Sequence, residues 1–272
     1  MGALALNETR ISAMPPSVFA LEDVSMVVEG RALLRAITLD IVEGRSVALV
    51  GHNGSGKSTL LKLLGRLAKP TAGRILFEGA PLESRDRRQL ARRLAHLPQT
   101  LPLAPGMLVK ELVALGRYPW HGALGRFSQE DRRKVEEAIE LTHLGPLAER
   151  MVDSLSGGER QRAWIAMLVA QDARCMLLDE PISALDIAHQ IEVLSLVRRL
   201  TAEKNVTIVT VLHDVNMAAR FCDDIVALRG GEVVSIGTPE SIMTPAELDR
   251  IFGVAMDVVR QPSSGLPLAF AR

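Results

Sequence analysis

The chain has 272 residues, of which 47% are hydrophobic and 24% charged, and its 32 basic side chains balance 32 acidic ones. This length fits one large domain or two small ones, and the apolar fraction is sufficient for a hydrophobic core. The neutral net charge argues against a general nucleic-acid-binding protein, which usually carries a basic excess. Aromatic residues make up only 3% of the chain, so a ligand site built from stacked rings would have few candidates.

The sequence carries no evident targeting segment. No stretch approaches the roughly 18 uninterrupted apolar residues of a membrane span. The N-terminus has no cationic start, and its apolar run breaks at Asn7, so it makes a poor signal peptide. Cys175 and Cys222 have apolar neighbours, which predicts reduced core residues, and the six histidines lack metal-ligand spacing. We therefore expect a soluble intracellular protein.

The N-terminal part of the chain favours strands. Residues 1–17 are expected to form a flexible extension. Residues 18–28 (VFALEDVSMVV) alternate and are rich in β-branched side chains, and residues 37–44 (ITLDIVEG) predict another strand that runs into a turn. Residues 47–50 (VALV) are wholly apolar, as in a buried parallel strand.

The remaining elements alternate between helix and strand. Residues 89–173 favour helix, including 134–141 (KVEEAIEL) and 160–171 (RQRAWIAMLVAQ). The strand-like runs 175–179 and 206–214 flank the helical run 187–204. This alternation predicts a parallel α/β core, interrupted by a helical insertion and followed by a short mixed segment after about residue 237.

A phosphate-binding loop is predicted at residues 51–58 (GHNGSGKS), which match G-x-x-x-x-G-K-[ST] between a buried strand and a helix. Glycines let successive backbone N–H groups turn toward phosphate oxygens at the positive end of the helix. Lys57 can reach the β- and γ-phosphates, and Ser58 can offer its hydroxyl to Mg²⁺. A chance glycine-rich turn is the alternative, but the strand–loop–helix context argues against it. The predicted nucleotide-binding residues are Gly51, His52, Asn53, Gly54, Ser55, Gly56, Lys57, Ser58 and Thr59.

Two carboxylates follow the apolar run at residues 175–178. Asp179 is placed to hold Mg²⁺ through water, because Mg²⁺ keeps several waters and takes one or two carboxylates. Glu180 could orient or deprotonate an attacking water. Alone, such a pair would be interpreted as a helix cap or a solvated turn; beside a phosphate loop, the catalytic interpretation is favoured.

Residues 155–161 (LSGGERQ) precede an apolar helix and form a second anion-binding helix start. The order of motifs is the phosphate loop, Gln99 in HLPQ, LSGGE, the Asp-Glu pair, residues 183–186 (SALD) and His213. Over roughly residues 18–240 the sequence therefore resembles the ATP-binding cassette (ABC) ATPases. The resemblance implies a P-loop ABC ATPase domain at 18–255, with a helical subdomain at about 100–165, an N-terminal antiparallel β subdomain and a short C-terminal tail at 256–272.

The resemblance also implies roles for the matching residues. Glu180 would be the catalytic carboxylate, supported by His213 at the γ-phosphate and by Gln99, which senses Mg²⁺ and water and links the site to a membrane partner. The implied Mg²⁺ residues are Ser58, Gln99 and Asp179. The resemblance also adds four residues to the implied ATP-binding residues. They act on the opposite subunit's nucleotide or across the dimer interface: Ser156, Gly157, Gly158 and Asp186.

One departure concerns the nucleobase. The family usually has an aromatic ring before the phosphate loop to stack on adenine, and that place falls near Val28. Phe19 is the nearest ring and is expected in the core. We therefore expect weaker selectivity for the base. Ile182 also replaces the small polar residue usual at its position, with no evident chemical consequence.

Two kinds of observation predict the kind of cassette: features that the sequence lacks, and a closer resemblance to the ATPases of particular importers. There is one cassette, no coiled-coil insertion, no membrane span and little chain after His213, which favours a compact importer ATPase. Residues 111–127, 163–175, 185–190 and 212–223 resemble ATPases of iron-siderophore and vitamin B12 importers, and 116–127 (GRYPWHGALGRF) resembles the ferric hydroxamate type. A turn-rich connection packed by Tyr118 and Trp120 is the alternative for that segment.

The resulting hypothesis is an ATP-hydrolysing subunit of a ferric siderophore importer. It would form a homodimer at the cytoplasmic face of the membrane, bind ATP and Mg²⁺, and act with a separate polytopic permease and indirectly with a substrate-binding protein, without nucleic acid. The alternatives are a vitamin B12 or haem importer, and a soluble cassette ATPase acting on nucleic acid or ribosomes.

A basic stretch at residues 84–93 has two interpretations. A solvated helix face is favoured, and attraction to anionic lipid headgroups is the alternative. The residues concerned are Arg85, Arg87, Arg88, Arg92 and Arg93.

Overall fold

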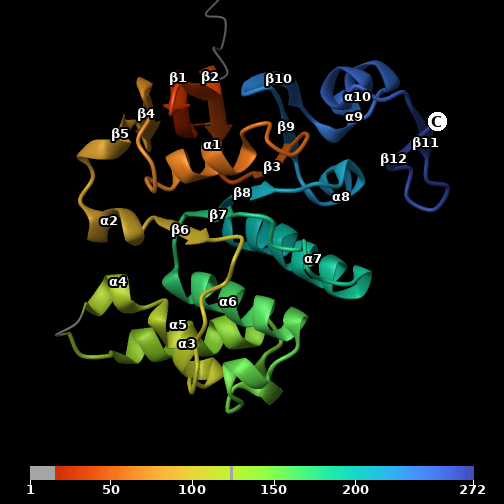
Figure 1. The fold of residues 1–272 in the computed structure, drawn as a ribbon. Coiled ribbons are helices and arrows are strands. Elements are labelled where there is room, and N and C mark those ends of the chain that lie inside the picture. Colours follow the sequence, from red (N-terminus) through yellow and green to blue (C-terminus); the bar gives the residue numbers. More distant parts are fainter. Residues whose placement is uncertain (1–15, 123–124) are drawn as a thin grey trace, which may run out of the picture.

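The computed structural model describes residues 16–122 and 125–272, so most of the predicted N-terminal extension lies outside the described residues. An antiparallel sheet occupies the N-terminal part, in the strand order β2-β1-β4-β5 (Figure 1). Its strands are β1 (Ser17–Val28), β2 (Arg31–Val42), β4 (Ala72–Phe77) and β5 (Ala80–Pro81). Glu29 and Gly30 both have positive φ, which suits the tight turn that joins β1 to β2. The predicted antiparallel β subdomain is confirmed.

The central sheet has the strand order β10-β9-β3-β8-β7-β6, and all its strands are parallel except β10. The strands are β3 (Ser46–Val50), β6 (Leu94–Leu97), β7 (Cys175–Leu178), β8 (Thr207–Val211), β9 (Asp224–Arg229) and β10 (Glu232–Gly237). Every residue of β3, β7 and β8 is buried, as expected for parallel strands covered on both faces. The predicted parallel α/β core is confirmed.

Alternate side chains of β3 enter two different hydrophobic clusters. Val47 and Leu49 belong to the cluster that contains the N-terminal sheet and α1 (Lys57–Leu64). Ala48 and Val50 belong to the cluster formed with α6 (Gly157–Gln171), α7 (Ile187–Lys204) and α8 (Val215–Phe221). Because successive strand residues point to opposite faces, β3 lies between both layers and holds the loop that follows it.

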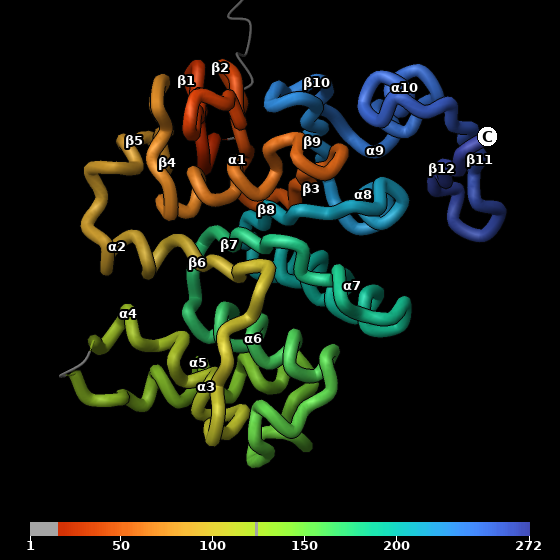
Figure 2. Tube along the Cα trace, in the orientation of Figure 1, coloured from red at the N-terminus to blue at the C-terminus, as the bar shows by residue number. Residues whose placement is uncertain are grey.

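The chain between β6 and β7 forms the helical part at the bottom of Figures 1 and 2, where α6 packs against both α3 and α5. The helices are α3 (Val109–Leu115), α4 (Tyr118–His121) and α5 (Gln129–Leu141), with 3-10 turns at Gly145–Leu147 and Val152–Ser154. A bridge between Leu108 and Met151 ties the two ends of the insertion together.

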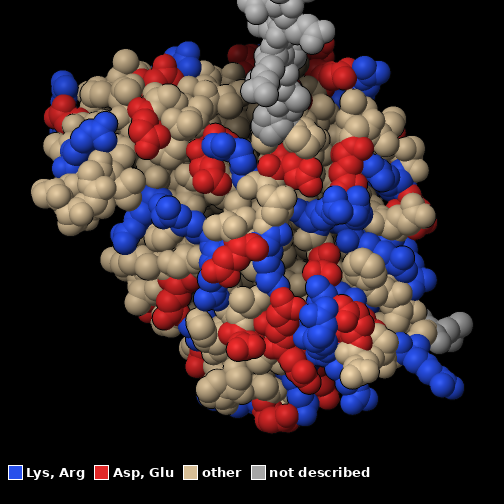
Figure 3. Space-filling model, turned by 180° about the vertical axis from the view of Figure 1, so that it is seen from behind, with Lys and Arg blue, Asp and Glu red and all other residues tan. Residues whose placement is uncertain are grey.

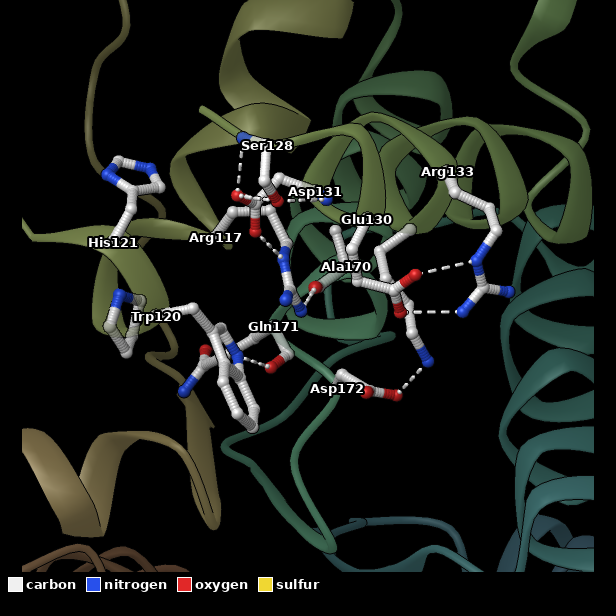
Figure 4. A network of polar contacts seen from close by, with 12 residues as sticks. Arg117, Trp120, His121, Ser128, Glu130, Asp131, Arg133, Ala170, Gln171 and Asp172 are labelled. Carbon is white, nitrogen blue, oxygen red and sulfur yellow. Dashed lines mark hydrogen bonds and ion pairs between the residues drawn. The ribbon is translucent and has the colours of Figure 1, made fainter. Parts of the chain in front are cut away.

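A buried ion pair fixes the helical part internally (Figure 4). Arg117 Nε donates to Asp131 Oδ1 at 2.8 Å, and both side chains are about 5% exposed or less. Arg117 also donates to the Ala170 carbonyl, and the Ser128 hydroxyl donates to the second oxygen of Asp131. Burial alone would raise the pKa of Asp131, but these hydrogen bonds outweigh it and lower the pKa from 3.8 to about 2.

Four of the five arginines at residues 85–93 contact other parts of the molecule, although Arg87 and Arg88 are exposed, as the predicted solvated face requires. Arg88 and Arg92 both reach from the region of α2 (Arg87–Ala91) to the Pro119 carbonyl, at 2.8 and 2.9 Å, and both also donate to the Trp120 carbonyl. The Arg85 guanidinium lies near the β4 carbonyls, and Arg93 pairs with Glu78. Arg85 and Arg93 share the carboxylate of Glu78, whereas bonds to backbone carbonyls leave the charges of Arg88 and Arg92 in place.

The C-terminal residues are also ordered. A 3-10 turn at Leu82–Ser84 follows β5. After β10 come α9 (Pro239–Ile242), α10 (Pro245–Phe252), β11 (Met256–Arg260) and β12 (Pro267–Ala271). Asn216 of α8 exchanges two hydrogen bonds with the backbone of Ala269, at 2.7 and 3.0 Å. The segment expected to be a short tail is therefore a hairpin held against α8 (Figure 2).

Charge and burial agree with the composition. Figure 3 shows acidic and basic side chains interspersed over the lower half of the rear face. Ion pairs of the helical part include Arg133–Glu130 and Lys134–Asp172. Cys175 and Cys222 are buried and free, as predicted, and burial raises the pKa of both thiols, that of Cys222 to about 12. No helix within 16–122 and 125–272 combines the length and hydrophobicity of a membrane span.

Candidate nucleotide-binding site

The phosphate loop runs from the end of β3 into α1, and packing fixes its glycines. Gly51 has φ 137°, and a Cβ there would lie 2.0 Å from the Leu228 carbonyl oxygen of β9. Gly56 has φ 106°, and its Cβ would lie 2.6 Å from Leu34 Cδ2 of β2. These two positions therefore require glycine. At Gly54 an added Cβ would meet nothing within 4 Å, so the loop is open where a phosphate would approach.

Two polar side chains of the loop are suited to phosphate. Lys57 is only 5% exposed, and its ammonium donates to the carbonyls of Gly51 and His52, both at 2.8 Å. Burial lowers the pKa of Lys57, while Glu180 and Asp179 act in the opposite direction. The buried Ser55 hydroxyl has no hydrogen-bond partner in the described part of the chain. The loop therefore fits an anion that would accept from both groups.

Ser58 and Asp179 meet where α1 begins and β7 ends. The Ser58 hydroxyl donates to Asp179 Oδ1 at 2.9 Å, and Asp179 is 4% exposed. A hydroxyl and a carboxylate placed together fit Mg²⁺, which completes its shell with waters and phosphate oxygens. Within the described residues, no three His, Cys, Asp or Glu side chains gather to enclose a metal by themselves.

Glu180 lies between two partners that the sequence predicts to be catalytic. Gln99 Nε2 donates to Glu180 Oε2 at 2.9 Å, and His213 Nε2 lies 2.8 Å from Glu180 Oε1. Glu180 also has φ 52°, a left-handed backbone that a non-glycine residue adopts at a cost and that is often found at functional sites. The three side chains come from the ends of different strands of the central sheet.

A cavity of about 280 Å³ joins these groups. The phosphate loop lines it together with Glu180 and His213, and Arg31 and Leu33 of β2 complete it. The sequence did not point to Arg31 and Leu33; the only available signal was their place just after the turn that follows Val28. Among the described residues that line the cavity, none is Phe, Tyr or Trp.

Two residues considered for the nucleobase do not line this cavity, although Val28 pairs with Arg31, which does. Phe19 is fully buried and packs on Phe77, with 4.9 Å between ring centroids, so its predicted core position is confirmed. Val28 is 42% exposed and pairs with Arg31 across the β-turn. The ring of His52 lies against Phe252 of α10 and contacts its carbonyl group, so only the backbone of His52 faces the loop interior.

The LSGGE residues lie apart from the phosphate loop within one chain. Ser156 caps α6 by accepting from the Glu159 N–H, and Glu159 accepts from the Ser156 N–H. Asp186 caps α7 in a similar way. Neither these residues nor Gly157 and Gly158 line the cavity at the loop. Within one chain, the LSGGE turn and the phosphate loop therefore form two separate surfaces.

A wider cleft of about 410 Å³ lies beside the LSGGE turn. It is lined by residues 99–105, by Glu180 and the turn that follows it, and by the start of α6. Glu180 lines both this cleft and the cavity at the phosphate loop. Gln99 lines the cleft and donates a hydrogen bond to Glu180.

Residues 34–183 match the family model described as ABC transporter. The chain belongs to the ABC transporter family. It is 42% identical to the ferric enterobactin transport ATP-binding protein of Escherichia coli, over 85% of this chain and 86% of that protein. It is 40% identical to the iron(3+)-hydroxamate import ATP-binding protein of Bacillus subtilis, with 88% of each chain covered. A hemin import ATP-binding protein of Shewanella denitrificans is also 40% identical, over 88% of this chain and 94% of that one.

Solved structures show the same fold. A structure described as a metal-chelate type ABC transporter in an inward-facing conformation matches with a TM-score of 0.82 and 27% identity, covering 95% of this chain and 98% of that one. A dimeric ATP-binding cassette in a post-hydrolysis state, bound to ADP and Pi, matches with a TM-score of 0.70 and 30% identity, covering 81% and 98%. The chain is thus an ATP-binding subunit of an ABC transporter and an ATPase coupled to transport.

Proposed function

We propose that this protein hydrolyses ATP as a homodimer to energise import of ferric siderophores, most specifically ferric hydroxamates, through a separate membrane permease at the cytoplasmic face of the membrane. A substrate-binding protein would deliver the cargo to that permease. The names of the relatives support an iron-chelate substrate. The observation that carries the proposed chemistry is Glu180, which lies between Gln99 and His213 beside the phosphate loop.

Dimerisation is supported by the separation of the two anion-binding surfaces. The start of α6 and the phosphate loop do not share a cavity in one chain, so a head-to-tail pair would bring each to the other's nucleotide. The dimeric cassette among the structural neighbours supports the same arrangement. Two ATP molecules would then be held between the subunits, with Ser156, Gly158 and Asp186 facing the partner's nucleotide.

The residues of this chain divide the reaction among them. Lys57 would exchange its two carbonyl partners for phosphate oxygens, and the N–H groups of the loop would hold the β-phosphate. Mg²⁺, held through Ser58 and Asp179, would neutralise charge on the β- and γ-phosphate oxygens. Glu180 would orient the attacking water and accept its proton, while Gln99 and His213 keep the carboxylate in place.

The segment at residues 116–127 supports a permease contact with part of its surface. Trp120 is fixed inside, because its indole N–H donates to the Gln171 carbonyl at 2.8 Å and its ring lies between the guanidiniums of Arg92 and Arg117. Tyr118, in contrast, is 55% exposed. Trp120 therefore packs the segment down, as the alternative interpretation predicts. We propose Tyr118 as a contact to the permease. Residues 123 and 124 of this segment lie outside the described residues.

The substitution Glu180→Gln tests the proposed chemistry. Glutamine keeps the size of the side chain and one oxygen acceptor but cannot take a proton. We expect kcat to fall by about 100-fold or more, while ATP binding persists and an ATP-bound dimer accumulates. Phosphate release and size-exclusion chromatography with light scattering measure both effects.

Glu149→Gln is the matched control, since Glu149 is exposed and pairs only with Lys110. It should hydrolyse ATP like the wild type. Undiminished turnover of the Glu180→Gln protein would contradict the role assigned to Glu180.

A further inference from the structure

His189, in the first turn of α7, lies directly behind the first turn of α6. A Cβ added to Gly158 would lie 2.4 Å from His189 Cδ2 and 2.7 Å from its Cγ. The imidazole therefore fills the space that any larger residue at position 158 would need.

The same imidazole is also bonded to Asp186. His189 Nδ1 lies 2.8 Å from Asp186 Oδ1, and the His189 backbone N–H donates to the same oxygen at 3.0 Å. The backbone and ring hydrogen bonds both lower the pKa of Asp186. One side chain thus contacts both Gly158 and Asp186, which belong to different motifs.

Further contacts of α6 and α7 lie next to His189. Arg162 of α6 pairs with Glu192 of α7, one turn beyond Gly158 and His189. Gln190 Nε2 donates to the Leu185 carbonyl at 2.9 Å and holds the turn that leads into α7. Among these residues, His189 is the one that contacts both Gly158 and Asp186.

We propose that His189 is a positioning residue that fixes the LSGGE turn relative to the Asp186 turn, so that both meet the partner subunit's nucleotide in one geometry. The inference rests on the proposed homodimer. Its physical basis is that small displacements of groups around a reacting phosphate reduce the rate strongly. Because His189 lines no part of the loop cavity, nucleotide binding by one subunit does not depend on it.

Two substitutions separate the two contacts of His189. His189→Asn keeps a donor near Asp186 but removes the ring from Gly158, whereas His189→Phe keeps the ring and removes the donor. We expect each to lower kcat about tenfold and to weaken ATP-dependent dimerisation in the Glu180→Gln background. Titration of a fluorescent ATP analogue should give an unchanged Kd for the single subunit. Glu192→Gln, which removes only the ion pair to Arg162, is the control and should keep wild-type kcat.

A double substitution tests the contact itself. Gly158→Ala should be severely impaired in the wild-type background, because its methyl group meets the imidazole. In the His189→Ala background the methyl group has room, so the additional loss from Gly158→Ala should be at least several-fold smaller. Circular dichroism and thermal unfolding establish that each variant is folded.

The outcomes distinguish the inference from the proposed function. If the wild type neither hydrolyses ATP nor dimerises with it, the proposed function fails and this inference fails with it. If the wild type does both, wild-type kcat in either the Asn or the Phe variant overturns the inference alone. Equal losses from Gly158→Ala in the two backgrounds would also overturn it.

Discussion

At the scale of single residues, the site depends on side chains that restrain one another. Lys57 is held on two carbonyls, Ser58 on Asp179, and Glu180 between Gln99 and His213. The motif spacing predicted this grouping, because the ends of parallel strands and the loop after β3 meet at one edge of the sheet. The sequence could not predict the place of the His52 ring or of Arg31, because α10 and β2 approach the loop only in the folded chain.

Nucleobase recognition can be tested at the same scale. With Arg31 and Leu33 at the cavity and no aromatic ring among its described lining residues, the base itself is held weakly, so we expect similar Kd values for ATP and GTP. Val28→Tyr should tighten ATP binding by about fivefold, since one stacked base contributes roughly 1 kcal/mol. Fluorescence competition with the two nucleotides measures both effects. A strong preference of the wild type for ATP would refute the expectation.

At the scale of elements, buried polar contacts decide how the helical part is built. Periodicity predicted α5, α6 and α7 because their apolar residues recur at helical spacing. It could not predict that α4 is short, or that Arg117 and Asp131 form a buried pair, because that pairing joins residues from separate helices. Composition could not predict that Arg88 and Arg92 donate to backbone carbonyls, because it does not reveal those partners.

The Arg117–Asp131 pair gives a prediction about acid stability. Asp131→Asn leaves the Arg117 charge buried without its partner, so the free energy of unfolding at pH 7 should fall by about 3 kcal/mol. The native pKa of about 2 lies below the unfolded 3.8, so the stability from Asp131 is present above pH 3.8 and lost as the pH falls toward 2. The gap between wild type and variant should therefore narrow between pH 5 and 2 in denaturant titrations.

Glu130→Gln serves as the comparison, because Glu130 is exposed and bonds to Arg133 on the same helix. Its unfolding curve should stay close to that of the wild type, because an exposed ion pair contributes little to stability. A gap between wild type and Asp131→Asn that stays constant down to pH 2 would contradict the assignment.

At the scale of the whole molecule, the proposed function depends on a permease. Deletion of this ATPase should abolish iron-restricted growth on single defined hydroxamate siderophores, and reintroduction of the wild-type chain, but not of Glu180→Gln, should restore it. Unaffected growth of the deletion strain on every hydroxamate would refute the substrate class. Growth lost instead on haem alone would assign the chain to that cargo.

The anchoring of α4 has a consequence for how such a subunit can diverge. Arg88 and Arg92 hold α4 through the carbonyls of Pro119 and Trp120, which every residue type supplies. Exposed neighbours such as Tyr118 can therefore be exchanged during evolution without loosening the attachment of α4 to the region of α2. The same scaffold can in this way acquire a new permease partner by changing surface side chains alone, while the arginines and the nucleotide site stay as they are.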